Sequence, residues 1–255
     1  MTKPKSIIIA TEGTTTNLLF ETLTSITEVQ TVIIESPISK TVLIKNRIKR
    51  IGLLKVIGQI MFMALVIPIL KIKSKVRISE IISRYKLSNS SIPVKKITQI
   101  KSVNNQEIIS LVNVHKPDYI FINGTRIIGK NILDQLAIKP INIHVGITPK
   151  YRGVHGGYWA LYNGDHHLFG TTLHFVDSGI DSGTVIDQKT IVPGEKDQFL
   201  TYPILQYCEG LEMLKNNIRL SFQATEKKPL SHENTLYFHP TIFQYIYKRL
   251  VSKIK

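Results

Sequence analysis

The sequence predicts an α/β fold, a mostly parallel sheet with helices on both faces. Along much of its 255 residues, short runs rich in Ile and Val alternate with segments whose apolar residues recur at helical spacing. Strands and helices that alternate in this way imply parallel strands joined by helices that cover the sheet. A hydrophobic content of 43% is typical of a globular chain with a sizeable core.

The individual elements follow from these runs. The segments predicted as strands are residues 6–10, 30–35, 96–100, 119–123, 140–144, 171–176 and 184–192, and the last two are expected to form a hairpin at the sheet edge. The segments predicted as helices are residues 18–23, 105–115, 131–136 and 201–222, with Thr or Asn available to cap the first. The aromatic, basic tail at 229–255 is expected to end in a helix.

Residues 1–200 are expected to form one main domain, interrupted at about 40–90 by a basic and apolar helical insertion, and 201–255 a short helical C-terminal extension. Cys208 is the only cysteine, which excludes an internal disulfide framework and suits a reducing compartment. The apolar run near the N-terminus spans only residues 7–10, far shorter than the core of a signal peptide. We therefore expect a cytoplasmic protein.

The formal charge of +15 is concentrated in one segment. Between Ser36 and Ser79 there is no acidic residue, and ten Lys and Arg contribute two thirds of the net charge: Lys40, Lys45, Arg47, Lys49, Arg50, Lys55, Lys71, Lys73, Lys75 and Arg77. Such clustering favours an anionic partner met by this region, although a solvated basic surface has the same composition.

The same segment contains fifteen uncharged residues, 56–70, flanked by Lys55 and Lys71. A membrane span needs about twenty apolar residues, and Pro68 interrupts this run, so we expect a helix that does not cross a membrane. Two interpretations stay open. The helix is buried or forms the interface of a homodimer, or it lies on an anionic membrane surface, held by its basic flanks and making the protein peripheral there.

Three polar residues form a candidate catalytic set. Asn142 and His144 lie two residues apart in a predicted strand, so their side chains share one face. The strand leads into a loop at the edge where parallel sheets bind ligands. Asp181 lies 37 residues beyond His144, in the glycine-flanked run DSGIDSG.

This set suits acyl transfer to an amine. The Asn142 amide and an imidazolium can donate hydrogen bonds to a tetrahedral oxyanion, His144 can take the amine proton, and Asp181 can stabilise the charged imidazole. A strand-end hydrogen bond and a turn aspartate would produce the same spacing, so spacing alone does not decide between these interpretations. The His166–His167 pair beside Asp165 has no further ligands at suitable spacing, and no metal site is predicted.

The runs NIHVGITPKYRG and TLHFVDSGIDSG strongly resemble the folate-dependent formyltransferase family. That family includes sugar N-formyltransferases, methionyl-tRNA formyltransferase and glycinamide ribonucleotide formyltransferase. The resemblance implies a Rossmann-like fold, 10-formyltetrahydrofolate as co-substrate without a metal, and a catalytic triad of Asn142, His144 and Asp181. One departure is Val145-Gly146-Ile147-Thr148 where relatives have Pro-Ser-Leu-Leu, which puts the contact of the family's serine in doubt.

The resemblance also implies ligand sites. Relatives bind the pterin, largely through backbone groups, at the segment that matches residues 123–128. The loop 176–181 would close the other side of this pocket. The resemblance therefore implies six cofactor-binding residues: Arg126, Ile127, Ile128, Val176, Asp177 and Gly179. The loop 13–17 resembles the phosphate loop of the glycinamide ribonucleotide enzymes, although it can equally be a helix cap. The candidate substrate-binding residues are Thr14, Thr15, Thr16, Asn17, Tyr151, Arg152 and His155.

Within the family, the acceptor expected from the resemblance is a small phosphorylated amine, most plausibly a nucleotide-linked amino sugar. A tRNA acceptor is disfavoured because the roughly sixty residues after Val192 look helical rather than like a β-barrel domain, and no nucleic-acid partner is expected. The alternatives are glycinamide ribonucleotide or methionyl-tRNA formyl transfer, a formyl-folate hydrolase, and a noncatalytic protein that binds anionic surfaces.

Overall fold

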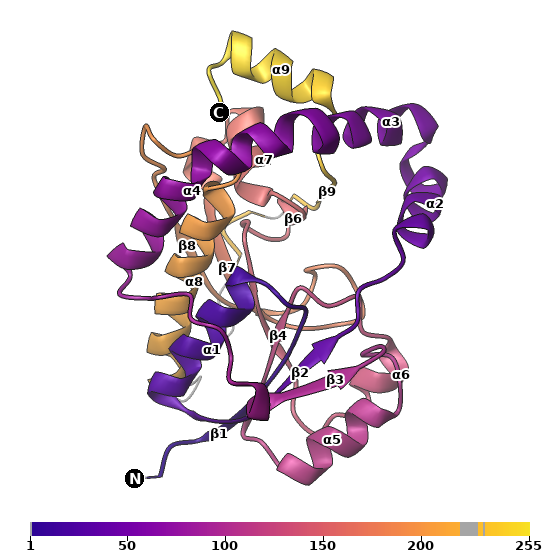
Figure 1. Cartoon of the computed structure of the whole chain (residues 1–255), viewed down its shortest axis with the longest axis vertical. Helices are drawn as coiled ribbons and strands as arrows, with labels where there is room; N and C mark the ends of the chain where they lie inside the picture. The colour runs from indigo at the N-terminus through magenta and orange to yellow at the C-terminus, as the bar shows by residue number, and fades with distance from the viewer. Residues whose placement is uncertain (1, 220–228, 232) are drawn as a thin grey trace.

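A seven-stranded sheet with the order β3-β2-β1-β4-β5-β7-β8 forms the centre of the protein (Figure 1). In this computed structural model, residues 2–219, 229–231 and 233–255 are described. The strands are β1 (Lys5–Ala10), β2 (Glu28–Glu35), β3 (Ile97–Ile100), β4 (Tyr119–Asn123), β5 (Ile141–His144), β7 (Gly170–Phe175) and β8 (Val185–Thr190). The first five run parallel, and β7 and β8 form an antiparallel hairpin at one edge. The predicted α/β fold and edge hairpin are confirmed.

Helices cover both faces of this sheet, and the alternation along β1 shows how. Ile8 and Ala10 pack in one apolar cluster with α1 (Thr14–Ile26) and α8 (Tyr202–Arg219), while Ile7 and Ile9 pack in a second cluster with α5 (Glu107–His115) and α6 (Lys130–Leu133). Because successive strand residues face opposite sides, a strand covered on both faces is apolar throughout. This explains the unbroken Ile-Ile-Ile run of β1.

The helix α8 belongs to the same core. Its buried side chains Leu205, Cys208, Leu211 and Leu214 recur every three residues and pack with α1 and the strands β5 and β7. The predicted boundary at residue 200 falls directly before this helix. Residues 220–222, which were included in the predicted helix, lie outside the described residues.

The insertion after β2 is helical, as predicted. It consists of α2 (Lys40–Ile51), α3 (Leu53–Met61), a π-helical turn η1 (Phe62–Val66) and α4 (Ile67–Arg84). The last three form one continuous helical segment along one end of the molecule (Figure 1). Pro68 does not interrupt it, contrary to the prediction. The wider π turn directly precedes Pro68, where a regular turn would meet the missing N–H and the proline ring.

The C-terminal part lies against the insertion. The helix α9 (Ile242–Val251) begins with a capping box made by Thr241 and Gln244, and it contacts α3 and η1. The remaining short elements are the 3₁₀ turns η2 (Val94–Lys96) and η3 (His166–Leu168), the helix α7 (Gly156–Asn163), and the parallel pair β6 (Arg152–Gly153) and β9 (Leu236–Tyr237).

Candidate active site

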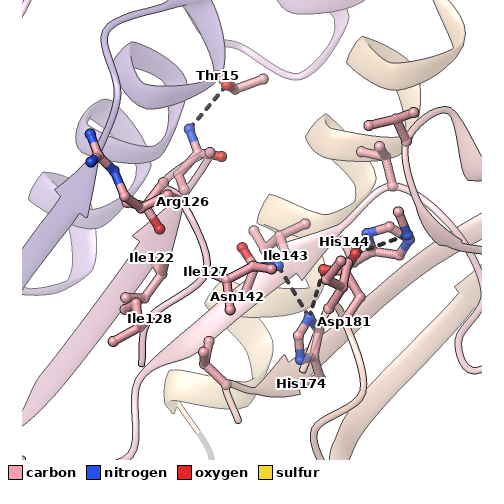
Figure 2. Close-up of a pocket in the computed structure, with 18 of the residues that line it drawn as sticks. Thr15, Ile122, Arg126, Ile127, Ile128, Asn142, Ile143, His144, His174 and Asp181 are labelled. Carbon is pink, nitrogen blue, oxygen red and sulfur yellow. Dashed lines mark hydrogen bonds and ion pairs between the residues drawn. The ribbon is translucent and has the colours of Figure 1, made fainter. Parts of the chain in front are cut away.

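A cavity of about 470 Å³ lies at the carboxyl ends of β4 and β5, and Asn142, His144 and Asp181 all line it (Figure 2). The first two project from β5, whereas Asp181 comes from the loop between β7 and β8. The carboxyl ends of parallel strands meet at one edge of the sheet, where connecting loops leave room for a ligand. The sheet topology therefore brings together residues that are far apart in the sequence.

Both ring nitrogens of His144 have a partner. Nε2 lies 2.7 Å from the backbone carbonyl oxygen of Tyr151, and Nδ1 lies 3.3 Å from Asp181 Oδ2. A carbonyl oxygen only accepts hydrogen bonds, so Nε2 carries a proton and donates it. This leaves Nδ1 as the nitrogen that can gain or lose a proton beside the carboxylate. The imidazole is only 5% exposed, so its orientation is fixed by its surroundings.

The Asp181 carboxylate is held by the segment that follows Tyr151. The backbone N–H of Gly153 donates to Asp181 Oδ2 at 3.0 Å, and Arg152 Nη1 donates to the carbonyl of Ile180 at 3.1 Å. Asp181 itself has a left-handed backbone, with φ of 47°, a conformation that Asp tolerates better than most residues. The β6 strand thus fixes the loop that brings the carboxylate to His144.

Asn142 is oriented by His174, which the sequence placed near the site but to which it assigned no catalytic or binding role. His174 Nδ1 donates to the backbone oxygen of Phe175 at 2.8 Å, so its Nε2 is an acceptor, and Asn142 Nδ2 lies 3.1 Å from it (Figure 2). Burial lowers the pKa of His174, which keeps the ring neutral. Asn142 is left with its carbonyl oxygen and second N–H for the cavity. The strand register could have identified His174, because this residue lies directly opposite Asn142 in the antiparallel pair of β5 and β7.

All six predicted cofactor-binding residues line the cavity. The Arg126 guanidinium, however, points to Glu35, with Nε 2.6 Å from Oε1, and its Nη2 donates to the carbonyl of Ser36. Glu35 also accepts the backbone N–H groups of Arg126 and Val103, at 3.0 and 2.8 Å. Arg126 therefore anchors the loop with its side chain and offers mainly backbone to the cavity.

A second anchor of the same loop is Asn104. Its side chain donates to the carbonyl of Ile127 at 2.9 Å and accepts the N–H of Gly129 at 2.6 Å. Glu35 and Asn104 were not identified from the sequence. For Glu35 the available signal is a charged residue at the buried carboxyl end of a strand, since a buried carboxylate needs a partner.

Most side chains of the predicted phosphate loop form hydrogen bonds with other groups of the protein. Thr15 lines the cavity, where Asn123 Nδ2 donates to its hydroxyl at 3.0 Å. Thr16 is buried and donates to the carbonyl of Thr11, and Asn17 donates to the side chain of Asn89 at 3.2 Å. The predicted capping by Thr or Asn is wrong, because Gly13 occupies the N-cap position without a side-chain bond.

The other predicted substrate residues lie around the cavity rather than inside it. The Tyr151 ring is fully buried, stacks on Tyr237 and hydrogen-bonds Asp165, so only its carbonyl oxygen reaches the site. His155 is half-buried, and its Nε2 lies 3.1 Å from His239 Nδ1. Burial lowers the pKa of His155 to about 3 and that of His239 to about 4.

The glycine that departs from the family pattern makes the His144 contact possible. A β-carbon on Gly146 would lie 2.4 Å from the Tyr151 carbonyl oxygen and 2.7 Å from His144 Nε2. Both distances are far below van der Waals contact, so any larger residue would push the carbonyl and the imidazole apart. The absence of a side chain at position 146 lets a backbone oxygen bind the ring directly.

Comparisons with known proteins agree with this geometry. The family model described as formyl transferase matches residues 68–200, just over half of the chain. The chain belongs to the formyl transferase family. The methionyl-tRNA formyltransferase of Desulfotalea psychrophila is 30% identical over 162 residues, covering 58% of this chain and 48% of that protein. The chain thus spans about half the length of this curated relative.

Solved structures of two other kinds share the fold. A sugar N-formyltransferase from a Shewanella species superposes with a TM-score of 0.56 at 15% identity, over 92% of this chain and 76% of that one. The phosphoribosylglycinamide formyltransferase of Streptococcus pneumoniae gives a TM-score of 0.53 at 18% identity, over 88% of this chain and all of that one. The predicted Rossmann-like formyltransferase fold is therefore confirmed.

Proposed function

We propose that this protein transfers a formyl group from 10-formyltetrahydrofolate to the amine of a small phosphorylated acceptor, a nucleotide-linked amino sugar. The observation that carries the proposal is one cavity in which Asn142, His144 and Asp181 converge beside a recess formed by the 122–128 and 176–181 loops. A neutral amide, an imidazole and a carboxylate are the groups that amine formylation requires.

The recess has the chemistry to hold the flat pterin of the folate. Its walls carry the apolar side chains Ile122, Ile128 and Val176, and the loop that contributes Ile127 is fixed by Glu35 and Asn104. When bound, the folate supplies a formyl carbon that an amine nitrogen can attack. A preorganised backbone edge recognises a heteroaromatic ring at low entropic cost, because the loop is ordered before the ligand arrives.

In this proposal His144 is the general base. With its proton on Nε2 held by the Tyr151 carbonyl, the ring accepts the proton of the attacking amine at Nδ1, directly or through water. The imidazolium that forms then donates from Nδ1 to Asp181 Oδ2, 3.3 Å away, and the opposite charge stabilises it. Asp181 thus lowers the energy of the state in which the proton has moved. His144 would then return this proton to the folate nitrogen, so that the bond between that nitrogen and the formyl carbon breaks and the formyl group stays on the acceptor.

Asn142 stabilises the negative oxygen that develops as the carbon–nitrogen bond forms. One N–H of its amide is held by His174, so the plane of the amide is fixed and the second N–H can donate to the oxyanion. In this arrangement His174 is a positioning residue. It acts on the reaction through the orientation of Asn142, and its Nε2 also lies 3.7 Å from Asp181 Oδ1.

The acceptor assignment rests on positive charge and on the position of α1. The chain is strongly basic, Thr15 places the start of α1 at the cavity, and free N–H groups in a first helical turn favour phosphate. A diphosphate-linked sugar carries about two negative charges near neutral pH and would gain from both. A structural neighbour named as a sugar N-formyltransferase supports this choice, whereas relatives named as methionyl-tRNA formyltransferases support the alternative acceptor.

The test is a folate-release assay on the purified chain with nucleotide-linked amino sugars, glycinamide ribonucleotide and methionyl-tRNA. We expect saturable formylation of an amino sugar, weakened by added salt and by Thr15→Val. A preference of about tenfold or more in kcat/KM for either other acceptor would overturn the sugar assignment while leaving formyl transfer standing. Release of formate without any acceptor would instead assign a hydrolase.

A further inference from the structure

The helical segment α3–η1–α4 carries an apolar ridge on its outward side. Ile57, Met61, Leu65, Ile69, Ile72 and Val76 recur every three or four residues, and all are exposed. We call these six residues the ridge. Three- and four-residue steps keep side chains on one helix face, so the ridge is continuous along the segment. Ile72 is 81% exposed and Val76 70%, values that belong to polar residues on ordinary surface helices.

The opposite face of this segment is packed on the rest of the protein. Phe62 is fully buried against the rings of Phe199 and Tyr245. Buried polar contacts add to this packing, with Gln59 donating to the carbonyl of His239 at 2.6 Å and Arg77 pairing with Asp197 at 2.8 Å. The segment therefore lies flat along the protein. It is long and apolar enough by composition to span a membrane, but its inner face packs against the rest of the protein.

The helix α9 extends the apolar surface. It contacts α3 and η1 and lies alongside α3 at the same end of the molecule (Figure 1). Phe243 and Leu250 are 71% and 75% exposed on it. Two separate parts of the sequence thus place large apolar side chains at one end of the protein, a concentration that marks an interaction surface rather than scattered surface residues.

Positive charge borders this surface. Lys55 lies near one end of the ridge, and Lys71, Lys73 and Lys75 lie among its later residues, all exposed. Of the ten Lys and Arg between Ser36 and Ser79, only Arg77 forms an ion pair with the residues that the structure describes. The charge is therefore not neutralised within the described part of the chain.

We propose that the ridge and α9 dock this protein on an anionic lipid membrane, with the helices lying in the plane of the interface. An apolar face bordered by lysines matches this environment, because the apolar side chains enter the acyl boundary while the ammonium groups reach the lipid phosphates. A second copy of this chain fits less well. In a symmetric dimer the same lysine-rich patch would face itself, and like charges would meet without acids to balance them.

The proposal does not depend on formyl transfer and is tested without an activity assay. The full chain is mixed with phosphatidylcholine vesicles, with or without about 30% phosphatidylglycerol, and the bound fraction is measured by flotation. We expect binding only to the anionic vesicles at about 0.05 M salt, weakened severalfold at about 0.5 M.

Variants separate the apolar and the charged contributions. Leu54 is 85% exposed at the start of α3, three residues before Ile57, and it continues the ridge toward the N-terminal end of that helix. Leu54→Glu with Ile72→Glu should reduce binding by about tenfold or more. Val114→Glu should leave it unchanged, because this residue is 77% exposed but lies on α5. Lys73→Glu with Lys75→Glu should also reduce binding, by about 25-fold or more, since each lysine near an anionic surface contributes about fivefold. The matched control is Lys95→Glu with Lys101→Glu, on either side of β3.

Circular dichroism and melting curves establish that the variants are folded. The proposal is overturned if folded wild-type protein does not float with the anionic vesicles, or if the ridge and control variants bind equally. It is also overturned if light scattering finds a dimer that Leu54→Glu with Ile72→Glu dissociates while vesicle binding is absent. That outcome would assign the surface to a second copy of the chain.

Discussion

The polar side chains at the cavity are held by other groups of the protein, whereas apolar side chains of the helical insertion are exposed to solvent. At the cavity, each of the central polar groups is held by another group: His144 by Tyr151 and Asp181, and Asn142 by His174. On the insertion, the ridge side chains project from the protein with large exposed fractions. The difference indicates that the cavity is ordered before its ligand arrives, whereas the described part of the chain leaves the ridge exposed, as a docking surface requires.

The largest effect is expected at the centre of the cavity. His144→Asn removes the nitrogen that takes the amine proton, so kcat should fall by about a thousandfold or more. Folate affinity should change by less than about threefold, because the recess is formed by other loops. Single-turnover kinetics and equilibrium titration with a folate analogue measure the two quantities. Turnover within about tenfold of the wild type would show that His144 is not the base.

Gly146→Ala tests the contact between His144 and the Tyr151 carbonyl. The added carbon would overlap both groups, so we expect kcat to fall by about a hundredfold and stability by about 1–3 kcal/mol. Denaturant unfolding gives the stability and steady-state kinetics the turnover. Gly194→Ala is the matched control, since its β-carbon would make only ordinary contacts. A fully active Gly146→Ala protein would contradict the role given to this backbone contact.

His174→Phe should leave Asn142 without its orienting acceptor. We expect kcat to fall by about tenfold while KM for the acceptor stays nearly constant, because the loss occurs mainly in the transition state. His174→Gln restores an oxygen that can accept from Asn142 Nδ2, and it should recover part of the rate. Equal rates for the Phe and Gln variants would assign His174 a packing role only.

The stability of the fold should depend on pH through two half-buried histidines, His155 and His239. His155 and His239 have folded pKa values of about 3 and 4, below the ordinary value of 6.5. Below pH 6.5 the unfolded chain binds protons that the folded chain does not, so stability falls as the pH drops toward 4. We expect a loss of about 2 kcal/mol per histidine by pH 5, measured by urea unfolding.

His155→Gln should flatten this pH dependence, whereas His166→Gln, at an exposed position, should leave its slope unchanged. An unchanged slope in the first variant would show that this pair of imidazoles does not control acid stability.

The smallest effect is expected on the ridge. Ile72→Glu should change the free energy of unfolding by less than about 0.5 kcal/mol, because an exposed side chain loses little packing. On the inner face of the same segment, Phe62→Ala should cost about 3–5 kcal/mol. Thermal and urea unfolding compare them. A large loss in Ile72→Glu would mean that the ridge stabilises the fold itself, and the contrast between the two regions would disappear.

The local pattern of the sequence was enough to predict the architecture. Strand periodicity and β-branched runs located β1, β2, β4 and the β7–β8 hairpin to within about two residues, because a buried strand must be apolar on both faces. Asn142, His144 and Asp181 were predicted as the catalytic set from the motif runs and their resemblance to the formyltransferase family, because the shared strand face and the glycine-flanked loop did not decide by themselves. The sequence also predicted the helical insertion and its positive charge.

Only the tertiary structure decided which groups hold these residues. The contacts of Glu35 with Arg126, of Tyr151 with His144 and of His174 with Asn142 join segments that lie 91, 7 and 32 residues apart. Such contacts depend on strand order and loop path, which hydrophobic periodicity does not encode. The same holds for Pro68, whose π turn keeps the helix continuous, and for the ridge. The sequence determined that the insertion is apolar and basic, but packing of its inner face through Phe62 decided which side chains remain in solvent.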